Sequence, residues 1–429
     1  MSDGSSKRAI DNAIADVEVY SDKQRYHELF RQLRAEDPVR WTEPDKYRPF
    51  WTVAKHADIV EVQRQGDIFL SAPRTTLNTI EAEQKIRAAT GRHQVQRTVV
   101  SMDGAEHMAM RNVAREWFLP RNINALEADI GRIAKATVDE MVAHDGACDF
   151  AQDIAVWYPL RVILKIFGLS GDVEAEKRLL RLSQEMNGSL DRETQRSGSQ
   201  GDHMLQVVAE MFEYFRPIAE DRRRNPKSDL ASVIANATLN GEPMSDLNVF
   251  SYYLTVTVAG HDTTSASTAG GLQALIESPG EMAKLRANPD VIRTAVDEMV
   301  RWVHPVKHFF RTASQDYELR GRKIKAGDSL LMCYPSACRD EDVFKEPFTF
   351  RADRSPNPHL AFGFGPHLCL GQYLAKLEMA ALYRELLSRV GDIELDGEPV
   401  ESKTLFMGGL RRLPIRYSLT HEPVLAHAS

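Results

Sequence analysis

The chain has 429 residues, of which 43% are hydrophobic and 27% are charged, and its formal net charge is -7. This balance is enough to bury a large core, and it excludes a disordered, collagen-like or disulfide-scaffold protein. The net negative charge argues against a general nucleic-acid binder, so we expect no nucleic-acid partner.

Neither a membrane span nor a secretion signal is apparent in the sequence. No stretch reaches the ~18 apolar residues needed to cross a bilayer. The N-terminal residues include Asp3, Lys7, Arg8 and Asp11 and lack the apolar core of a signal peptide. The four cysteines form no C-x-x-C pair. We therefore expect a cytoplasmic protein without membrane attachment, whose cysteines remain thiols.

Apolar residues recur at three- and four-residue spacing along most of the chain, which predicts helices. The predicted helices are 22–35, 54–65, 105–118, 123–143, 151–167, 201–223 and 370–389. The predicted strands are shorter: 39–41, 50–53, 309–313, 317–319, 323–324, 329–333, a segment near 405, and 415–418. Because no Gly/Ser/Pro-rich linker or repeat marks a boundary, we expect one large domain, 1–429. It is predicted to be mainly α with a small β region near 39–53, 309–333 and 405–418.

Two regions, 74–98 and 185–201, are polar and lack clear periodicity. Long polar loops often act as lids or binding segments. We predict that both are loops that move, and the sequence leaves open whether they are open or closed.

The segment 248–276 is apolar on nearly every face, which predicts a helix through the middle of the protein. The motif A-G-H-D-T-T at 259–264 interrupts it. Burying Asp262 without partners is costly, and Gly260 costs about 1 kcal/mol in helix propensity. Gly and Thr can also divert backbone hydrogen bonds and open a local bulge. The motif is therefore either a functional site or a polar break satisfied by water.

Residues 362–371 read F-G-F-G-P-H-L-C-L-G and place Cys369 in a glycine-rich loop before a predicted helix. Gly363 and Gly365 permit backbone angles closed to other residues, and Gly371 lets the backbone approach a bulky flat group. The unpaired N–H groups and dipole of the helix favour a thiolate. Such a thiolate can be a nucleophile, a zinc ligand or the axial ligand of haem iron.

Zinc is one competing hypothesis for this cysteine. The candidate ligands are Cys333, Cys338, His359, His367 and Cys369. Their spacing argues against zinc, because structural sites use short ligand pairs such as C-x-x-C. A cysteine protease is also disfavoured, because no motif places a histidine base and an orienting carboxylate with Cys369.

The cysteine loop resembles that of the cytochrome P-450 monooxygenases. The matching residues are Phe362, Gly365, His367, Cys369 and Gly371. Residues 259–264 resemble the family's central-helix motif A-G-x-D-T-T, and the order and separation of the motifs agree over nearly the whole chain. The finer sequence is similar to the soluble bacterial branch that includes the alpha-terpineol hydroxylase. One departure is Ser355, where the family usually has an aromatic residue.

The resemblance implies the cytochrome P-450 fold, a single large domain that encloses haem b, with Cys369 as the axial ligand of the iron. It implies that Phe362 and Gly363 contact the haem. It also implies that four cations or donors bind the haem propionates: His107, Arg111, Arg311 and His367.

The resemblance further implies a buried ion cluster of Glu298, Arg301 and Arg354. The string E-x-x-R alone is uninformative, because it recurs elsewhere in the chain as solvated helical pairs. At Glu298 the context of the motif favours the cluster, and we assign it a structural role.

The implied activity is that of a haem-thiolate monooxygenase using O2. In this interpretation Asp262 and Thr263 form an acid–alcohol pair that delivers protons. Because no G-x-G-x-x-G fingerprint follows a strand, electrons are expected from a [2Fe–2S] ferredoxin with its NAD(P)H-dependent reductase. Three basic residues are expected to form the docking face: Arg115, Arg339 and Lys376.

The substrate is expected to be apolar and small to medium in size, such as a monoterpene or an alkyl-aromatic hydrocarbon, with a steroid or a fatty acid as the alternative. The expected pocket residues are Thr255, Ala259, Val306, Phe309 and Phe406. The side chains of Lys307 and His308 are expected to contact solvent, a propionate or a substrate hydroxyl, and the sequence leaves these three alternatives open. A haem-thiolate peroxygenase would use hydrogen peroxide and often lacks the acid–alcohol pair, and a haem sensor would need no proton relay.

Overall fold

Helices make up most of the structure. The computed structural model describes residues 2–187 and 195–420. The helices before the gap are α1 (Ser2–Ala13), α2 (Val17–Tyr20), α3 (Lys23–Glu36), α4 (His56–Arg64), α5 (Ile80–Thr90), η1 (Val99–Ser101), α6 (Gly104–Arg115), α7 (Pro120–Asn124), α8 (Glu127–Val142), η2 (Phe150–Ala155), α9 (Trp157–Ile166) and α10 (Val173–Asn187). Those after it are α11 (Gln200–Arg224), α12 (Leu230–Ala235), α13 (Asp246–Ile276), α14 (Pro279–Ala287), η3 (Pro289–Val291), α15 (Ile292–Val303), α16 (Tyr334–Ala337), η4 (Gly365–His367) and α17 (Gln372–Arg389).

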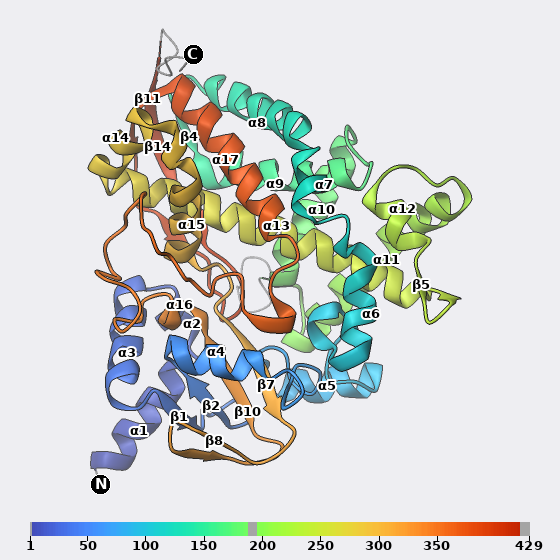
Figure 1. Ribbon diagram of the computed structural model, residues 1–429, viewed down its shortest axis with the longest axis vertical. Coiled ribbons are helices and arrows are strands. Elements are labelled where there is room, and N and C mark those ends of the chain that lie inside the picture. Colours follow the sequence, from blue (N-terminus) through green and yellow to red (C-terminus); the bar gives the residue numbers. More distant parts are fainter. Residues whose placement is uncertain (1, 188–194, 421–429) are drawn as a thin grey trace.

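The strands are short and gather mainly in one sheet. They are β1 (Val39–Thr42), β2 (Phe50–Val53), β3 (Phe69–Leu70), β4 (Ala147–Asp149), β5 (Thr238–Leu239), β6 (Glu242–Pro243), β7 (His308–Ala313), β8 (Tyr317–Leu319), β9 (Arg322–Ile324), β10 (Ser329–Cys333), β11 (Val390–Leu395), β12 (Val400–Glu401), β13 (Leu410–Arg412) and β14 (Pro414–Leu419). The main sheet has the order β1-β2-β10-β7-β3, in which β10 runs parallel to β2 and the other pairs are antiparallel. In Figure 1 this sheet lies below the helical part of the molecule.

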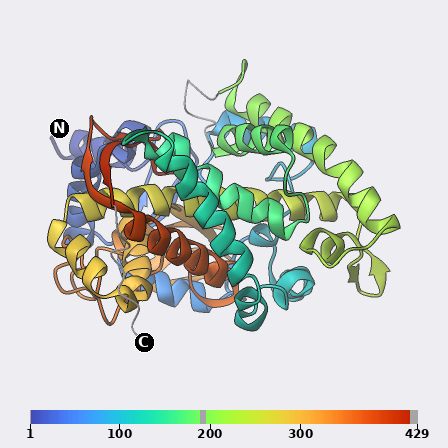
Figure 2. The same ribbon diagram turned by 90° about the horizontal axis from the view of Figure 1, so that it is seen from above.

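Helix α13 is the central element. Two perpendicular views show it crossing the width of the molecule (Figures 1 and 2). It packs against α9, α11 and α15. A Cβ added at Gly270 would lie 2.6 Å from Val303 Cγ2, and one added at Gly271 would lie 2.8 Å from Met299 Cγ. Glycine is therefore needed for α15 to pack this closely on α13.

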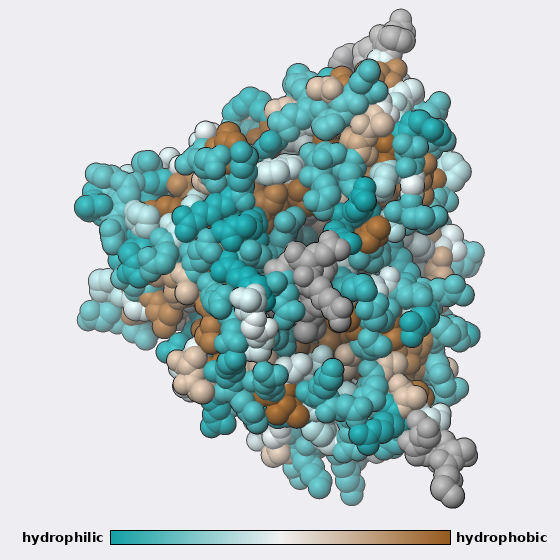
Figure 3. Space-filling view, turned by 180° about the vertical axis from the view of Figure 1, so that it is seen from behind, coloured by the Kyte–Doolittle hydropathy of each residue, from teal (hydrophilic) through white to brown (hydrophobic). Residues whose placement is uncertain are grey.

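The apolar side chains form a main core around α13, α9, α8, α15 and α17, with two smaller clusters on the faces of the main sheet. Hydrophilic side chains cover most of the surface seen in Figure 3. Among the described residues, no helix has both the length and the apolar character that a bilayer-spanning segment needs.

A buried ion cluster anchors α15. Glu298 is fully buried and accepts hydrogen bonds from Arg301 Nε and Nη2, both at 2.7 Å, and from Arg354 Nε at 3.0 Å. Arg301 Nη1 also donates to the carbonyl oxygens of Cys338 (2.8 Å) and Pro347 (3.0 Å). The three predicted residues therefore join α15 to the chain that leads to the cysteine loop.

The mainly helical fold with a small β region is confirmed, but region 74–98 is not a loop throughout. It contains α5 (Ile80–Thr90). The Thr79 side chain accepts a hydrogen bond from the Ala82 N–H, and Gly91 ends the helix with a φ of 69°. These local caps define a helix whose apolar pattern is weak. In region 185–201, α10 ends at Asn187 and α11 begins at Gln200, and residues 188–194 lie outside the described part.

Other predictions needed smaller corrections. The helix predicted at 123–143 is divided into α7 and α8, because Pro120 starts a separate short helix. The helix predicted at 151–167 begins as the π-helical turn η2. The segment near 405 forms no strand, and Val306 and Met407 form an isolated bridge. α13 is continuous through 259–264, so the bulge that Gly and Thr could open is not formed.

Candidate active site

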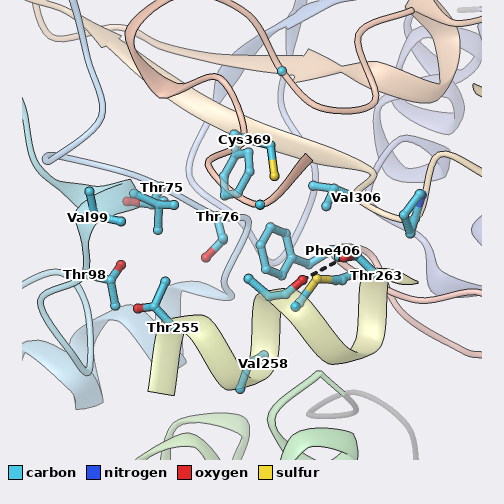
Figure 4. Close-up of a pocket in the computed structure, with 18 of the residues that line it drawn as sticks. Thr75, Thr76, Thr98, Val99, Thr255, Val258, Thr263, Val306, Cys369 and Phe406 are labelled. Atoms are coloured by element: carbon cyan, nitrogen blue, oxygen red, sulfur yellow. Dashed lines mark hydrogen bonds between the residues drawn. The ribbon is translucent and has the colours of Figure 1, made fainter. Parts of the chain in front are cut away.

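A cavity of about 400 Å³ lies between α13 and the loop that carries Cys369 (Figure 4). Its walls are mostly apolar, and the volume lies in the range of small-molecule and cofactor sites. Cys369 and Thr263 enter it from opposite sides. It is therefore the place where a group held by the cysteine and a molecule held by α13 would meet.

The cysteine loop is held by its own backbone. The Cys369 N–H donates to the Phe362 carbonyl oxygen at 2.8 Å, and the Leu368 N–H donates to that of Gly365 at 3.0 Å. Gly365 has a φ of 68°, and a Cβ there would collide with the Gln63 carbonyl oxygen of α4. The loop therefore requires glycine at this position to rest on α4.

The surroundings of Cys369 have opposing effects on the pKa of its thiol. Burial raises the pKa of Cys369, whereas the backbone N–H groups of Gly371 and Gln372 and the charges of Arg111 and Lys376 lower it. Burial has the larger effect, so the helix end and the nearby cations alone do not produce the thiolate expected from the sequence. A metal ligated by the sulfur would supply the remaining stabilisation.

Four predicted basic residues meet at the cavity wall: His107, Arg111, Arg311 and His367. The imidazole rings of His107 and His367 are 4.0 Å apart between centroids. Burial and then the charge of Arg111 lower the pKa of His107, and burial and then Arg311 lower that of His367 to about 2. The cluster therefore lacks an anion that fully compensates it.

The nearby carboxylate of Asp103 compensates the cluster only in part, since its Oδ1 lies 4.0 Å from His367 Nε2. Asp103 accepts hydrogen bonds from the backbone N–H groups of Ser71 (2.7 Å) and Ala72 (2.8 Å). Among the described residues, buried His107 Nε2 has no hydrogen-bond partner. Arg311 is buried too, and its Nη1 donates to the Phe310 carbonyl oxygen at 2.7 Å. A ligand with two carboxylates would satisfy this wall of the cavity.

On the opposite wall, the two polar residues of α13 point in different directions. Thr263 lines the cavity, and its Oγ1 donates to the Ala259 carbonyl oxygen at 2.7 Å. Asp262 is not among the cavity-lining residues. Its Oδ2 accepts hydrogen bonds from Ser183 Oγ at 2.6 Å and Asn187 Nδ2 at 2.5 Å, both on α10. The carboxylate therefore lies between α13 and α10, behind the cavity wall.

The five residues expected from the sequence to form the pocket all line the cavity: Thr255, Ala259, Val306, Phe309 and Phe406. The rings of Phe309 and Phe406 are 5.4 Å apart between centroids. The Lys307 N–H donates to the Phe406 carbonyl oxygen at 2.7 Å, which holds the turn against the strand segment. Phe362 and Gly363 line the cavity as well.

Sequence reasoning missed one side of the cavity. Thr76 and Thr98 line it from the segment treated as a polar loop, Val99 lines it from η1 (Figure 4), and Asn187 lines it from the end of α10. Only the three-dimensional arrangement brings these segments to α13. His261 was also missed as a partner of Asp262, although its position inside the A-G-H-D-T-T motif was a usable signal.

Arg339 lies elsewhere than expected, and the structure narrows the possible contacts of His308 and Lys307. Arg339 is 1% exposed and donates to the carbonyl oxygens of Arg301 (3.0 Å) and Trp302 (2.8 Å), so it cannot belong to a docking face. His308 Nε2 accepts the Leu77 N–H at 3.0 Å and is buried, which removes it from solvent. Burial lowers the pKa of Lys307 to about 8, and this side chain does not line the cavity.

Comparison with known proteins assigns the family. A model of the cytochrome P450 family matches residues 23–419. The chain is 38% identical to cytochrome P450-terp of a Pseudomonas species, over 93% of this chain and 95% of that protein. It is 32% identical to linalool 8-monooxygenase of Pseudomonas putida, over 91% and 95%. The crystal structure of CYP108D1 from Novosphingobium aromaticivorans matches with a TM-score of 0.89 at 38% identity, covering 96% of this chain and 99% of that one.

The chain therefore belongs to the cytochrome P450 family and is a monooxygenase whose cofactor is haem b. The cavity fits that cofactor on three counts. A sulfur faces it, the buried basic cluster matches two propionates, and a Cβ added at Gly371 would meet no atom within 4 Å, which leaves room for a flat ring.

Proposed function

We propose that this enzyme hydroxylates a small to medium apolar substrate, a monoterpene or an alkyl-aromatic hydrocarbon, with O2 and electrons from a [2Fe–2S] ferredoxin. One observation carries the proposal. A single, mostly apolar cavity has Cys369 on one side and Thr263 on the other (Figure 4). The names of the relatives P450-terp and linalool 8-monooxygenase favour the monoterpene class.

In this proposal Cys369 would ligate the haem iron through its sulfur. Four residues would hold the propionates: His107, Arg111, Arg311 and His367. Phe362 and Gly363 would contact the macrocycle. The bound haem supplies the chemistry that activates O2, with the thiolate donating electron density to the iron. The protein fixes the haem, excludes water and controls the delivery of protons.

Asp262 and Thr263 act as the acid and the alcohol of the proton path. Asp262 retains a side-chain exposure of 14%, which gives its carboxylate a supply of protons from solvent. Thr263 Oγ1 donates its hydrogen to the Ala259 carbonyl oxygen. Because a hydroxyl oxygen also has two lone pairs, Oγ1 can still accept a proton while it faces the cavity. Asp262 would supply protons from the α10 side of α13, and the Thr263 hydroxyl would deliver them on the cavity side.

The substrate is held by the apolar part of the cavity. Val258, Val306, Phe309 and Phe406 present hydrocarbon surface, and these side chains cannot hydrogen-bond a charged group. A fatty acid would need a cation in this part of the cavity, so a neutral hydrocarbon or a terpene alcohol fits better. A steroid is the second candidate, and a binding screen distinguishes it from a terpene.

The electron donor binds outside the cavity. We propose a ferredoxin and its NAD(P)H-dependent reductase, because the sequence contains no nucleotide fingerprint of its own. Arg115 is exposed on α6 and remains a candidate contact. Lys376 Nζ lies 2.7 Å from Asp297 Oδ1, so its charge is partly neutralised. We also propose a cytoplasmic location, because all four cysteines are free thiols.

The test begins with the absorption spectrum of the reduced protein under carbon monoxide, which must report a thiolate-ligated haem. A spin-shift screen against terpenes, alkylbenzenes, steroids and fatty acids then identifies the ligand class. Turnover with O2, ferredoxin and reductase distinguishes a monooxygenase from a sensor, and turnover with hydrogen peroxide alone reveals a peroxygenase. Tight spin shifts with steroids and none with terpenes would contradict the proposed substrate class.

A further inference from the structure

His261 occupies a buried position beside the proposed acid. Its side chain has no exposure, and its ring points from α13 toward α10 and the end of η2. Its Nε2 lies 2.8 Å from the Val156 carbonyl oxygen. A carbonyl oxygen can only accept a hydrogen bond, so Nε2 carries a proton.

The other ring nitrogen faces two oxygens. Nδ1 of His261 lies 3.0 Å from Asp262 Oδ1 and 3.1 Å from Ser183 Oγ. The Ser183 hydroxyl has one hydrogen, which it donates to Asp262 Oδ2 at 2.6 Å. Both oxygens therefore present lone pairs to Nδ1. A neutral imidazole with a bare Nδ1 would place three lone pairs together in a buried site, at a large electrostatic cost.

We propose that His261 is an imidazolium that donates its Nδ1 hydrogen bond to Asp262, so that it positions the carboxylate and supplies it with the proton for each delivery. This inference rests on the proposed role of Asp262 as the acid. Within residues 2–187 and 195–420, the groups that face His261 from the packed elements are Asp262 on α13, Ser183 and the nearby Asn187 amide on α10, and the Val156 carbonyl. Among these, Asp262 is the only charged group.

The electrostatics agree with the geometry. Burial lowers the pKa of His261, but the charge of Asp262 and the hydrogen bonds to Asp262 and Val156 outweigh it, so the net shift is upward. Asp262 and His261 thus hold one proton between them. This arrangement keeps the pair neutral overall, which reduces the cost of burying a carboxylate in the wall of an apolar cavity.

The proton balance of the step is simple. The Nδ1–H bond breaks and an Oδ1–H bond forms across 3.0 Å, leaving a neutral imidazole and a carboxylic acid. The acid then passes this proton toward Thr263, and a hydronium ion from solvent supplies one proton through the partly exposed carboxylate, which restores the imidazolium–carboxylate pair. No electron moves in this sequence. His261 is therefore a positioning residue, since it acts through Asp262.

The protonation state can be read directly by nitrogen NMR on protein labelled at histidine, in the diamagnetic ferrous carbon monoxide form. His261→Gln assigns the signal by its disappearance, and His144→Gln, at an exposed histidine, serves as the matched control. We expect both nitrogens of His261 to carry protons at neutral pH, and one to lose its proton in Asp262→Asn. A neutral imidazole signal for His261 in the unmodified protein would overturn the inference.

Kinetics provide the second readout. A direct general acid contributes about 10²–10⁴-fold, so we expect a smaller, roughly tenfold fall in product formed per NAD(P)H in His261→Gln, with haem content and substrate spin shift unchanged. If Asp262→Asn stays fully coupled, the proposed acid role fails. If Asp262→Asn uncouples but His261 is neutral, or if His261→Gln stays fully coupled, only the present inference fails.

Discussion

Two carboxylates in this protein, one buried and one partly exposed, have opposite surroundings. Glu298 is fully buried and is held by the guanidinium groups of Arg301 and Arg354. Asp262 is held by a serine hydroxyl, an asparagine amide and a histidine, and 14% of its side chain stays accessible. Guanidinium groups do not release their protons in proteins, whereas imidazole can. The first cluster is therefore suited to fixing the fold, and the second to moving a proton.

The largest effect is expected from breaking the fixed cluster. Glu298→Gln leaves two buried guanidinium groups without their counter-ion, which should cost roughly 3–5 kcal/mol in the free energy of unfolding. Denaturant unfolding and haem retention measure it. Glu28→Gln, at an exposed pair with Arg31, is the control and should leave both unchanged. Retained stability in Glu298→Gln would show that the cluster is dispensable.

The next effect concerns proton delivery. Thr263→Ala should retain haem and substrate binding but divert reducing equivalents to hydrogen peroxide, because the hydroxyl that would deliver protons at the cavity is lost. Thr90→Ala is a matched control, since its Oγ1 also donates to the carbonyl oxygen four residues earlier, at 2.8 Å, but does not line the cavity. Measuring peroxide per NAD(P)H tests this, and a fully coupled Thr263→Ala would contradict the role.

Stability should depend on pH through His261. A raised pKa in the folded protein stabilises the fold below the ordinary imidazole pKa of about 6.5, and that contribution disappears as the pH rises through the raised value. The stability difference between the unmodified protein and His261→Gln should therefore be largest in mild acid and shrink in base. Chemical unfolding across pH measures it, and a difference that grows in base would contradict the assignment.

A smaller effect is expected at the surface. Arg115→Glu should slow reduction by ferredoxin at low ionic strength and have little effect at high ionic strength, because exposed charges are screened. Arg224→Glu, at the exposed end of α11, is the control. Stopped-flow reduction rates measure the change. Equal rates for both variants would remove Arg115 from the docking face.

The sequence predicted the cysteine side of the site better than the α13 side. The loop around Cys369 is local, so its glycines and helix start are readable from neighbouring residues. Helix α13 and the strands β2 and β10 were also predicted, since their apolar patterns are strong. The contacts of Asp262 with Ser183 and Asn187 join residues more than 70 positions apart, and no local pattern reports them.

Two incorrect predictions, for Arg339 and for α5, show the same limit of local sequence patterns. Arg339 was expected on the surface because arginine usually is, but its guanidinium caps carbonyl oxygens at the end of α15 and stacks 4.3 Å from the Trp302 ring. Helix α5 was missed because its apolar pattern is weak and its caps, Thr79 and Gly91, carry the signal. Burial and capping depend on neighbours that composition and periodicity do not specify.

The most direct test of the account compares product formed per NAD(P)H in Asp262→Asn and in the unmodified protein, at equal haem content and with a terpene that gives a full spin shift. Asp246→Asn, on the exposed first turn of the same helix, is the control. Asp262→Asn should lose about 10²-fold in product formed per NAD(P)H, and Asp246→Asn should lose nothing. Equal product per NAD(P)H in Asp262→Asn and in the unmodified protein would contradict the claim that this carboxylate supplies the protons.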